Sequence, residues 1–234
     1  MKKVLALCVM MAVVLVSGPA MAGMGLPGLS KSAAPAVDVN ALTARSAAVK
    51  RQVTNATIAL GSGLVEVMNA CGKKTEAAKL QATIDASKSN KDDIEKTKQL
   101  IAEVNTASNE TSKIDLQSKM DQSAARSSLG KSILFLGAGA ISDLSAVAAA
   151  KVLVTDLTTA ISSVKSAPAS YGPSALTNLA AALDAAKFIV ENVPPQVVTT
   201  QELTKGLVKY AQTNKIPIPS QADMEKSAKD MEKG

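Results

Sequence analysis

The ionisable and nucleophilic side chains of this sequence limit the chemistry that the chain can perform. Histidine does not occur among its 234 residues. Without imidazole, the usual Ser-His-Asp and Cys-His mechanisms, histidine-ligated zinc and the Glu-x-x-His iron sites of helical bundles are excluded. We therefore expect no catalytic residue, no cofactor and no metal ion, and a protein that is not an enzyme. An enzyme built on carboxylates alone is the catalytic alternative.

Carboxylates that could serve as acid and base are few, and they stand in polar surroundings. Asp92 and Asp93 are adjacent, whereas Glu202 and Asp223 are isolated from each other. Asp92 and Asp93 lie at the start of a predicted helix, where negative charge interacts favourably with the helix dipole. We interpret all four as solvated or helix-capping residues.

Asp143 and Lys151 are the charged residues inside the most apolar part of the chain, residues 133–154. They lie two helical turns apart on the same face of the predicted helix, which is too far for a direct i, i+4 ion pair. If both are buried, they are the charged positions of greatest interest. The alternative is that both lie at the wet edge of a helix.

Residues 125–132 fit a relaxed phosphate-loop pattern, with alanine in the place of the first glycine. That mechanism requires a strand before the loop and a helix after it. The preceding residues read as a polar helix, so we interpret the pattern as a helix end and a turn at Gly130.

Cysteine usage is minimal, because Cys71 is the single thiol once the predicted signal peptide is removed. No internal disulfide can then form. The helical phase of Cys71 favours burial, and an intermolecular disulfide is the alternative.

The apolar segment 133–141 carries small residues that allow helices to approach closely. It reads as either a buried central helix of a bundle or a membrane-active or partner-binding element. The run 133–154 is long enough to span a bilayer, but Asp143 and Lys151 would be costly there. The candidate residues for interaction or insertion are Leu134, Phe135, Leu136, Gly137, Gly139 and Ile141.

The N-terminal residues 1–22 have the pattern of a secretory signal peptide. Lys2 and Lys3 precede an apolar run over residues 4–16, and Ala20 and Ala22 supply the small residues read at a cleavage site. The apolar run is shorter than the ~20 residues that a membrane-spanning helix needs. We therefore expect an exported, periplasmic protein, with secretion as the alternative.

The charge of the chain is mild and evenly spread. The sequence has 26 basic and 20 acidic residues, and loss of Lys2 and Lys3 with the signal peptide leaves a net charge of 24 − 20 = +4. Basic and acidic residues alternate, and aromatic residues are rare, so nothing indicates a nucleic-acid surface.

Apolar residues recur every three or four positions along most of the chain, which is typical of helices. Helices are predicted over residues 38–71, 75–86, 91–120, 133–164, 175–192 and 199–213, and from 220 onward. Alternating strand patterns are nearly absent. The predicted fold is all-α: an elongated antiparallel bundle of about five to seven helices at residues 38–214, after a flexible leader at 23–37. A proline-containing strap and a charged helix or tail follow at 215–234.

These observations favour a non-enzymatic exported bundle that acts by binding, as a scaffold, adaptor or carrier in the bacterial cell envelope. Its expected partner is a protein or an apolar or lipid ligand, and not nucleic acid. The alternative of another class is a secreted membrane-inserting helical protein that uses residues 133–141. Contact with a membrane is left open.

Overall fold

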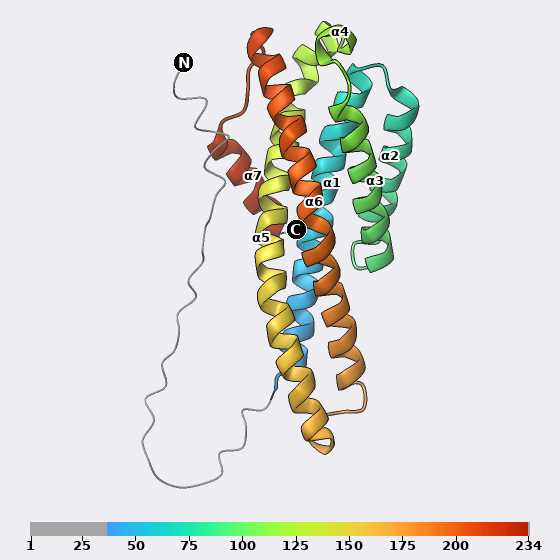
Figure 1. Ribbon diagram of the computed structural model, residues 1–234, viewed down its shortest axis with the longest axis vertical. Helices are drawn as coiled ribbons and strands as arrows, with labels where there is room; N and C mark the ends of the chain where they lie inside the picture. Colours follow the sequence, from blue (N-terminus) through green and yellow to red (C-terminus); the bar gives the residue numbers. More distant parts are fainter. Residues whose placement is uncertain (1–36, 234) are drawn as a thin grey trace. The chain divides into compact units, whose positions relative to one another are not determined.

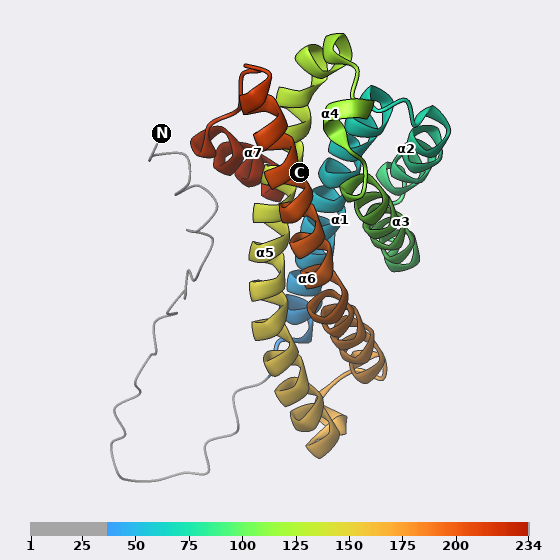
Figure 2. The ribbon, with the colours of Figure 1, turned by 45° about the horizontal axis from the view of Figure 1, so that its top comes forward.

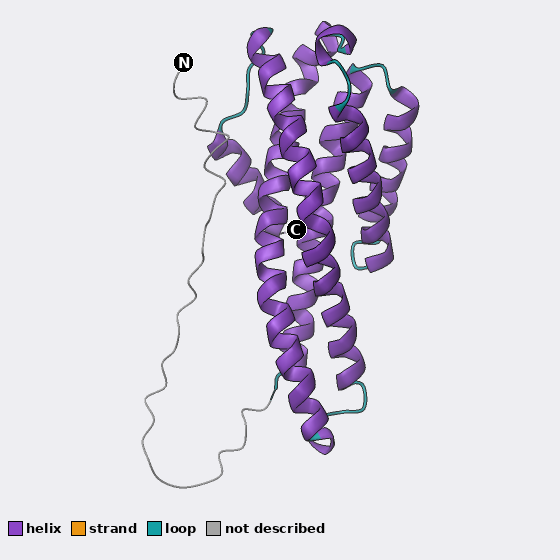
Figure 3. Ribbon diagram, viewed as in Figure 1, coloured by secondary structure: helices purple, strands orange, loops and turns teal. Residues whose placement is uncertain are grey.

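Residues 37–233 are described by the computed structural model, and all regular elements in that range are helical (Figure 3). The all-α class and the expected number of helices are confirmed, whereas the predicted signal peptide and leader, up to residue 36, lie outside the described range. In chain order the elements are α1 (Val39–Ala70), α2 (Lys74–Lys88), α3 (Ile94–Ser112), α4 (Leu116–Lys119), α5 (Gln122–Ser166), the 3-10 helix η2 (Pro168–Ser170), α6 (Ala175–Thr213) and α7 (Gln221–Lys233).

Several helix ends are fixed by the residues that lie at those ends. Asp38 begins α1 by accepting a hydrogen bond from the backbone N–H of Ala41 at 2.9 Å. Ser220 and Asp223 bond reciprocally at the start of α7, at 3.0 and 3.2 Å, which is a capping box. Gly72 ends the α1 turn with φ of 76°, a conformation that favours glycine.

Three long helices carry the bundle, and Figure 1 shows that α1 and α6 run in one direction and α5 in the other. Helix α5 has 45 residues, so it is about 68 Å long at 1.5 Å per residue. The α2–α3 pair packs on α1, and α3 also reaches α6. Helix α7 packs on α5 and α1, on the side away from the α2–α3 pair (Figure 2).

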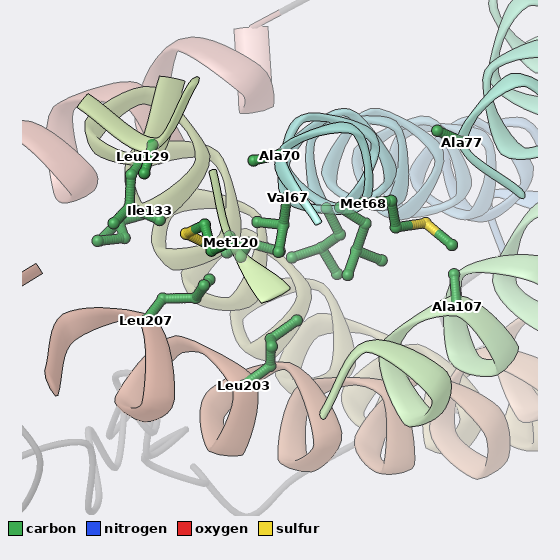
Figure 4. Packing of buried hydrophobic residues seen from close by; sticks show 14 of the residues in the cluster. Val67, Met68, Ala70, Ala77, Ala107, Met120, Leu129, Ile133, Leu203 and Leu207 are labelled. Carbon is green, nitrogen blue, oxygen red and sulfur yellow. The ribbon is translucent and has the colours of Figure 1, made fainter. Parts of the chain in front are cut away.

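The apolar core forms two clusters along these helices. In the larger one, Leu129 and Ile133 of α5 and Leu203 and Leu207 of α6 point toward Val67 of α1 (Figure 4). The second cluster lies farther along the three long helices and is built of smaller side chains: Val49, Val53, Ile101, Ala140, Ala146, Val147, Ala150, Ile189, Val193 and Val197. Small side chains allow close helix packing, so the separation of α1, α5 and α6 is set by alanines, valines and glycines.

The predicted helix end at Gly130 is wrong, because α5 begins earlier and passes through this residue. Asp121 starts α5 by accepting a hydrogen bond from the N–H of Ala124 at 2.7 Å. A Cβ at position 130 would lie 3.4 Å from the carbonyl oxygen of Pro217. Residue 130 therefore lies beside the strap after α6, at a distance that an added Cβ could tolerate as an ordinary contact. Within the helix predicted over 91–120, the polar stretch 106–113 is expected to be either solvated or broken. The structure shows a break, since α3 ends at Ser112 and α4 begins at Leu116.

The predicted helix end at Pro194 and Pro195 is also wrong, because α6 continues through both prolines. Each proline removes one backbone N–H donor and disfavours a helix interior by ~3 kcal/mol. Val193 and Val197, on either side, are 0% and 3% exposed in the second core cluster. Their burial on one face of α6 holds the helix together across the prolines.

Candidate functional site

The predicted interaction segment lies in the first half of α5, where α1 and α7 pack against it. Leu136, Gly137 and Gly139 are buried, whereas Leu134, Phe135 and Ile141 are half-buried. Among the described residues, α5 is the one helix that is long and apolar enough to cross a membrane, and 61% of its most apolar window is buried. Most of the segment thus forms packing surface, and its accessible part is the side of α5 that carries Phe135.

The two glycines of this segment mark close helix contacts. A Cβ at Gly139 would lie 2.7 Å from Leu60 Cδ2 and 2.9 Å from the backbone oxygen of Ala56, both on α1. A Cβ at Gly137 would overlap the side chain of Met224 on α7. Glycine is therefore what allows α1 and α7 to lie directly against α5.

Phe135 lines a shallow open groove beside these contacts, which we call the α1–α5 groove. Its volume is about 300 Å³, at the lower end of the range typical of small-ligand sites. The groove is bordered by α1, α5, the α2–α3 turn and α7, through Asn55, Ile58, Ala59, Ser62, Lys91, Phe135 and Met231. Its position explains why the sequence did not reveal it, because its walls come from four separate parts of the chain.

Positive charge borders this groove at Lys91 and near Phe135. Lys131 Nζ lies 5.5 Å from the centre of the Phe135 ring and 3.8 Å from Glu66 Oε1. A cation over an aromatic face is attracted by the electrons of the ring. The groove thus combines an apolar floor with a basic rim, and this arrangement is suited to binding.

The end of α7 forms one wall of the α1–α5 groove and is held by polar contacts. Asn55 Nδ2 donates to the carbonyl oxygen of Met231 at 3.1 Å. Gln52 Nε2 donates to Glu232 Oε1 at 3.0 Å. These bonds between side chains of α1 and the last turn of α7 position Met231 at the groove.

Asp143 occupies a separate site in the core. It is fully buried, and its Oδ2 accepts a hydrogen bond from Gln196 Nε2 of α6 at 2.7 Å. Gln196 Nε2 also donates to Thr57 Oγ1 of α1 at 3.2 Å. Burial raises the pKa of the Asp143 carboxyl well above its usual value, and the hydrogen bond from Gln196 opposes this shift. Of the two charged residues that the sequence singled out in this apolar run, Asp143 is buried and Lys151 is exposed.

The sequence analysis missed the partners of Asp143, although a signal for them exists. Thr57 stands one turn after Val53 and one turn before Leu60, on the buried face of α1. Gln196 stands in phase with Val193 and Thr200 on α6. Polar residues in the apolar phase of a helix are candidates for a buried network.

The other carboxylates that the sequence singled out have structural roles or are exposed. Arg51 donates two hydrogen bonds to the Asp92 carboxylate, at 2.6 and 3.0 Å. This hydrogen bonding lowers the pKa of the Asp92 carboxyl. Asp93 caps α3, Asp223 caps α7, and Glu202 is exposed. Within residues 37–233, no group of three or more carboxylates and thiols converges on a common point.

Two further sequence motifs are accounted for by the helices that carry them. The phosphate-loop-like residues 125–132 lie inside α5, so they form no loop. Cys71 is a free, half-buried thiol at the end of α1, and burial raises its pKa. A second small cleft, lined by residues that include Lys73, Glu76 and Lys113, lies near this end.

Comparison with known proteins finds no relative of this chain. No family model, no curated protein and no solved structure matches it.

Proposed function

We propose that this chain is a non-enzymatic helical-bundle protein that acts by binding in the bacterial cell envelope, and that its ligand occupies the α1–α5 groove. The observation that supports this is the composition of the groove. Ile58, Ala59 and Phe135 supply an apolar surface, and Lys91 stands at its border. Binding sites commonly pair a mainly apolar lining with a few charged or polar groups that orient the ligand.

The ligand class that best fits the groove is an amphiphile with one apolar chain and an anionic head group. The groove is shallow and open, with a volume of about 300 Å³, so it would cover part of one apolar chain. Burial of apolar surface stabilises such a complex by roughly 25 cal/mol per Å². Lys91 at the border favours a negative head group over a neutral one, whereas Lys131 beside the Phe135 ring is paired with Glu66.

Blocking the groove tests this proposal. Ser62→Trp places a large side chain in the groove, and we expect it to abolish binding of a fluorescent long-chain fatty acid. Ser127→Trp is the matched control, because Ser127 is an exposed serine of α5 whose hydroxyl also bonds to its own helix, to Ala124 O at 2.9 Å. No binding to the unmodified chain, or equal binding by both variants, would refute the proposal.

The charge preference is tested separately. Lys91→Glu should weaken binding of the fatty acid by about two- to five-fold, the equivalent of ~0.5–1 kcal/mol for a solvent-exposed ion pair. Binding of the corresponding fatty alcohol should be unchanged. Lys165→Glu, in the last turn of α5, is the control and should affect neither ligand.

Export is the second part of the proposal, and it is supported by the signal-peptide pattern at residues 1–22. Expression of the full chain in a diderm bacterium should yield a periplasmic protein that begins at Gly23. N-terminal sequencing of the fractionated protein measures this, and a cytoplasmic protein that retains Met1 would contradict it. Recovery of partners from envelope extract would then separate a carrier from an adaptor.

The apolarity of α5 favours one other candidate function, insertion into a membrane through residues 133–141. Insertion would require α1 and α7 to leave the face of α5 that they cover. Leakage of dye from liposomes of anionic lipid on addition of the chain would support this function. Intact vesicles at all tested pH values would argue against it.

A further inference from the structure

The buried polar cluster around Asp143 is distinct from the α1–α5 groove and holds together three helices. Asp143, Gln196 and Thr57 come from α5, α6 and α1, and each is 0% exposed. Members of the second core cluster flank them along the chain, with Ala140 and Val147 on α5 and Val193 and Val197 on α6. A charge placed here is surrounded by apolar side chains at the point where the long helices meet.

The buried polar cluster around Asp143 contains oxygen atoms that have no hydrogen-bond partner. Both described bonds use the side-chain amide of Gln196 as the donor, to Asp143 Oδ2 and to Thr57 Oγ1. Asp143 Oδ1, Gln196 Oε1 and Thr200 Oγ1 are buried without a partner. An ionised Asp143 can only accept hydrogen bonds, whereas a protonated Asp143 carries an O–H donor, and the Thr200 hydroxyl can itself donate.

No cation on the surrounding helices compensates a negative charge at Asp143. Desolvation and the Gln196 hydrogen bond are the two causes that shift its pKa, and no charged residue contributes. The charged residues nearest in sequence to the cluster are half-exposed or exposed: Lys50 and Arg51 on α1, Lys151 on α5, and Glu191 and Glu202 on α6. Lys50 and Arg51 both bind Asp92. On α3, Lys98 pairs with Glu95 and Glu103 with Lys79, and on α7 Glu232 binds Gln52.

We propose that Asp143 is held as the neutral carboxylic acid and that this proton is a structural component of the α1–α5–α6 junction. An unpaired carboxylate in an apolar interior is so unfavourable that the group binds a proton instead. The junction is thus a proton-binding site, and loss of the proton places an uncompensated negative charge among buried apolar side chains. The bundle therefore becomes less stable as the pH rises.

The direction of the effect follows from proton linkage. In the unfolded chain Asp143 ionises near its reference pKa of ~3.9. The folded state retains the proton to higher pH, so between these two pKa values the folded state binds one more proton than the unfolded state. Its contribution to stability is complete below the unfolded pKa and is lost progressively up to the folded pKa, above which it is constant.

The test compares the unmodified chain with Asp143→Asn, which keeps the shape of the side chain and cannot ionise. Urea unfolding over a pH series gives the ratio of their folding equilibrium constants, in which the contributions of all other groups cancel. We expect this ratio to fall about ten-fold per pH unit from ~4 up to the folded pKa of Asp143. Asp184→Asn, at an exposed position of α6, should give a ratio with no such fall, and a pH-independent ratio for Asp143→Asn would overturn the proposal.

Two further measurements keep the proposal testable if Asp143→Asn folds poorly. Carbon NMR of the unmodified chain, labelled at aspartate, should show one carboxyl that remains protonated at neutral pH, and full ionisation of all aspartates there would refute the proposal. Sodium and calcium chloride are compared with choline chloride at alkaline pH. Specific stabilisation of the unmodified chain by either metal ion would show that the oxygens hold a metal cation, and this outcome would also overturn the proposal.

Discussion

Substitution of Gly139 by alanine tests whether α1 and α5 are held at the separation that the structure shows. The added Cβ would lie 2.7 Å from Cδ2 and 2.8 Å from Cγ of Leu60, and 2.9 Å from the carbonyl oxygen of Ala56. The end of a leucine side chain can rotate away. The carbonyl oxygen belongs to the α1 backbone and can move only if the two helices separate.

The expected magnitude combines two opposing effects. Replacing a glycine by alanine in a helix interior stabilises the helix by ~0.5–1 kcal/mol. Overpacking of a close contact destabilises by ~1–3 kcal/mol. Gly206→Ala isolates the first effect, because Gly206 is also helical and its added Cβ would find only Leu116 Cδ1 at 3.8 Å, an ordinary contact. We therefore expect Gly139→Ala to be less stable than Gly206→Ala by ~1–3 kcal/mol.

Urea unfolding followed by circular dichroism measures both variants under the same conditions. Gly206→Ala should unfold at a higher urea concentration than the unmodified chain, and Gly139→Ala at a lower concentration than Gly206→Ala. Equal stability of the two variants would refute the close contact between α1 and α5. A loss of stability in both would show instead that the added methyl group is unfavourable for a reason unrelated to the contact.

Two further predictions concern single side chains. Burial raises the pKa of the Cys71 thiol, so its alkylation rate, followed by mass spectrometry over a pH series, should have a midpoint above the ~8.5 of an unperturbed cysteine; a midpoint at or below that of the urea-unfolded chain would contradict the burial. Asp93 accepts hydrogen bonds from the N–H groups of Glu95 and Lys96 at 2.9 and 3.3 Å, so Asp93→Ala should lower the free energy of unfolding by ~0.5–2 kcal/mol. Asp92→Ala removes only an exposed ion pair and should cost less; a larger loss in that variant would show that the capping role is assigned wrongly.

The helical class and several helix ends could be predicted because they depend on local physics. Asp38, Gly72 and the pair Ser220 and Asp223 act on backbone groups within a few residues of themselves. The ends predicted at Gly130 and Pro194 were wrong for different reasons. At the prolines, the burial of Val193 and Val197 outweighs the local preference for ending the helix, whereas Gly130 is a helix-interior glycine whose local cost α5 tolerates.

The sites were predictable only in part. Asp143 was recognisable from the sequence, because a charged residue in an apolar run is conspicuous. Its distance from Lys151, and its contact with Gln196 and Thr57, depend on the rotation of α5 and on which turns of α6 and α1 face it. The α1–α5 groove could not be predicted, since it exists only where α7 and the α2–α3 turn meet the long helices.

The proline pair in α6 has a mechanical consequence for the junction below it. Pro194 and Pro195 have no backbone N–H to donate to the carbonyl oxygens of Val190 and Glu191, so two successive helix hydrogen bonds are missing at this turn. Bending of α6 here breaks fewer hydrogen bonds than bending elsewhere along its length. The next residue, Gln196, donates hydrogen bonds to Thr57 of α1 and Asp143 of α5. Its side-chain amide therefore links α6 to both neighbouring helices at the turn where α6 resists bending least.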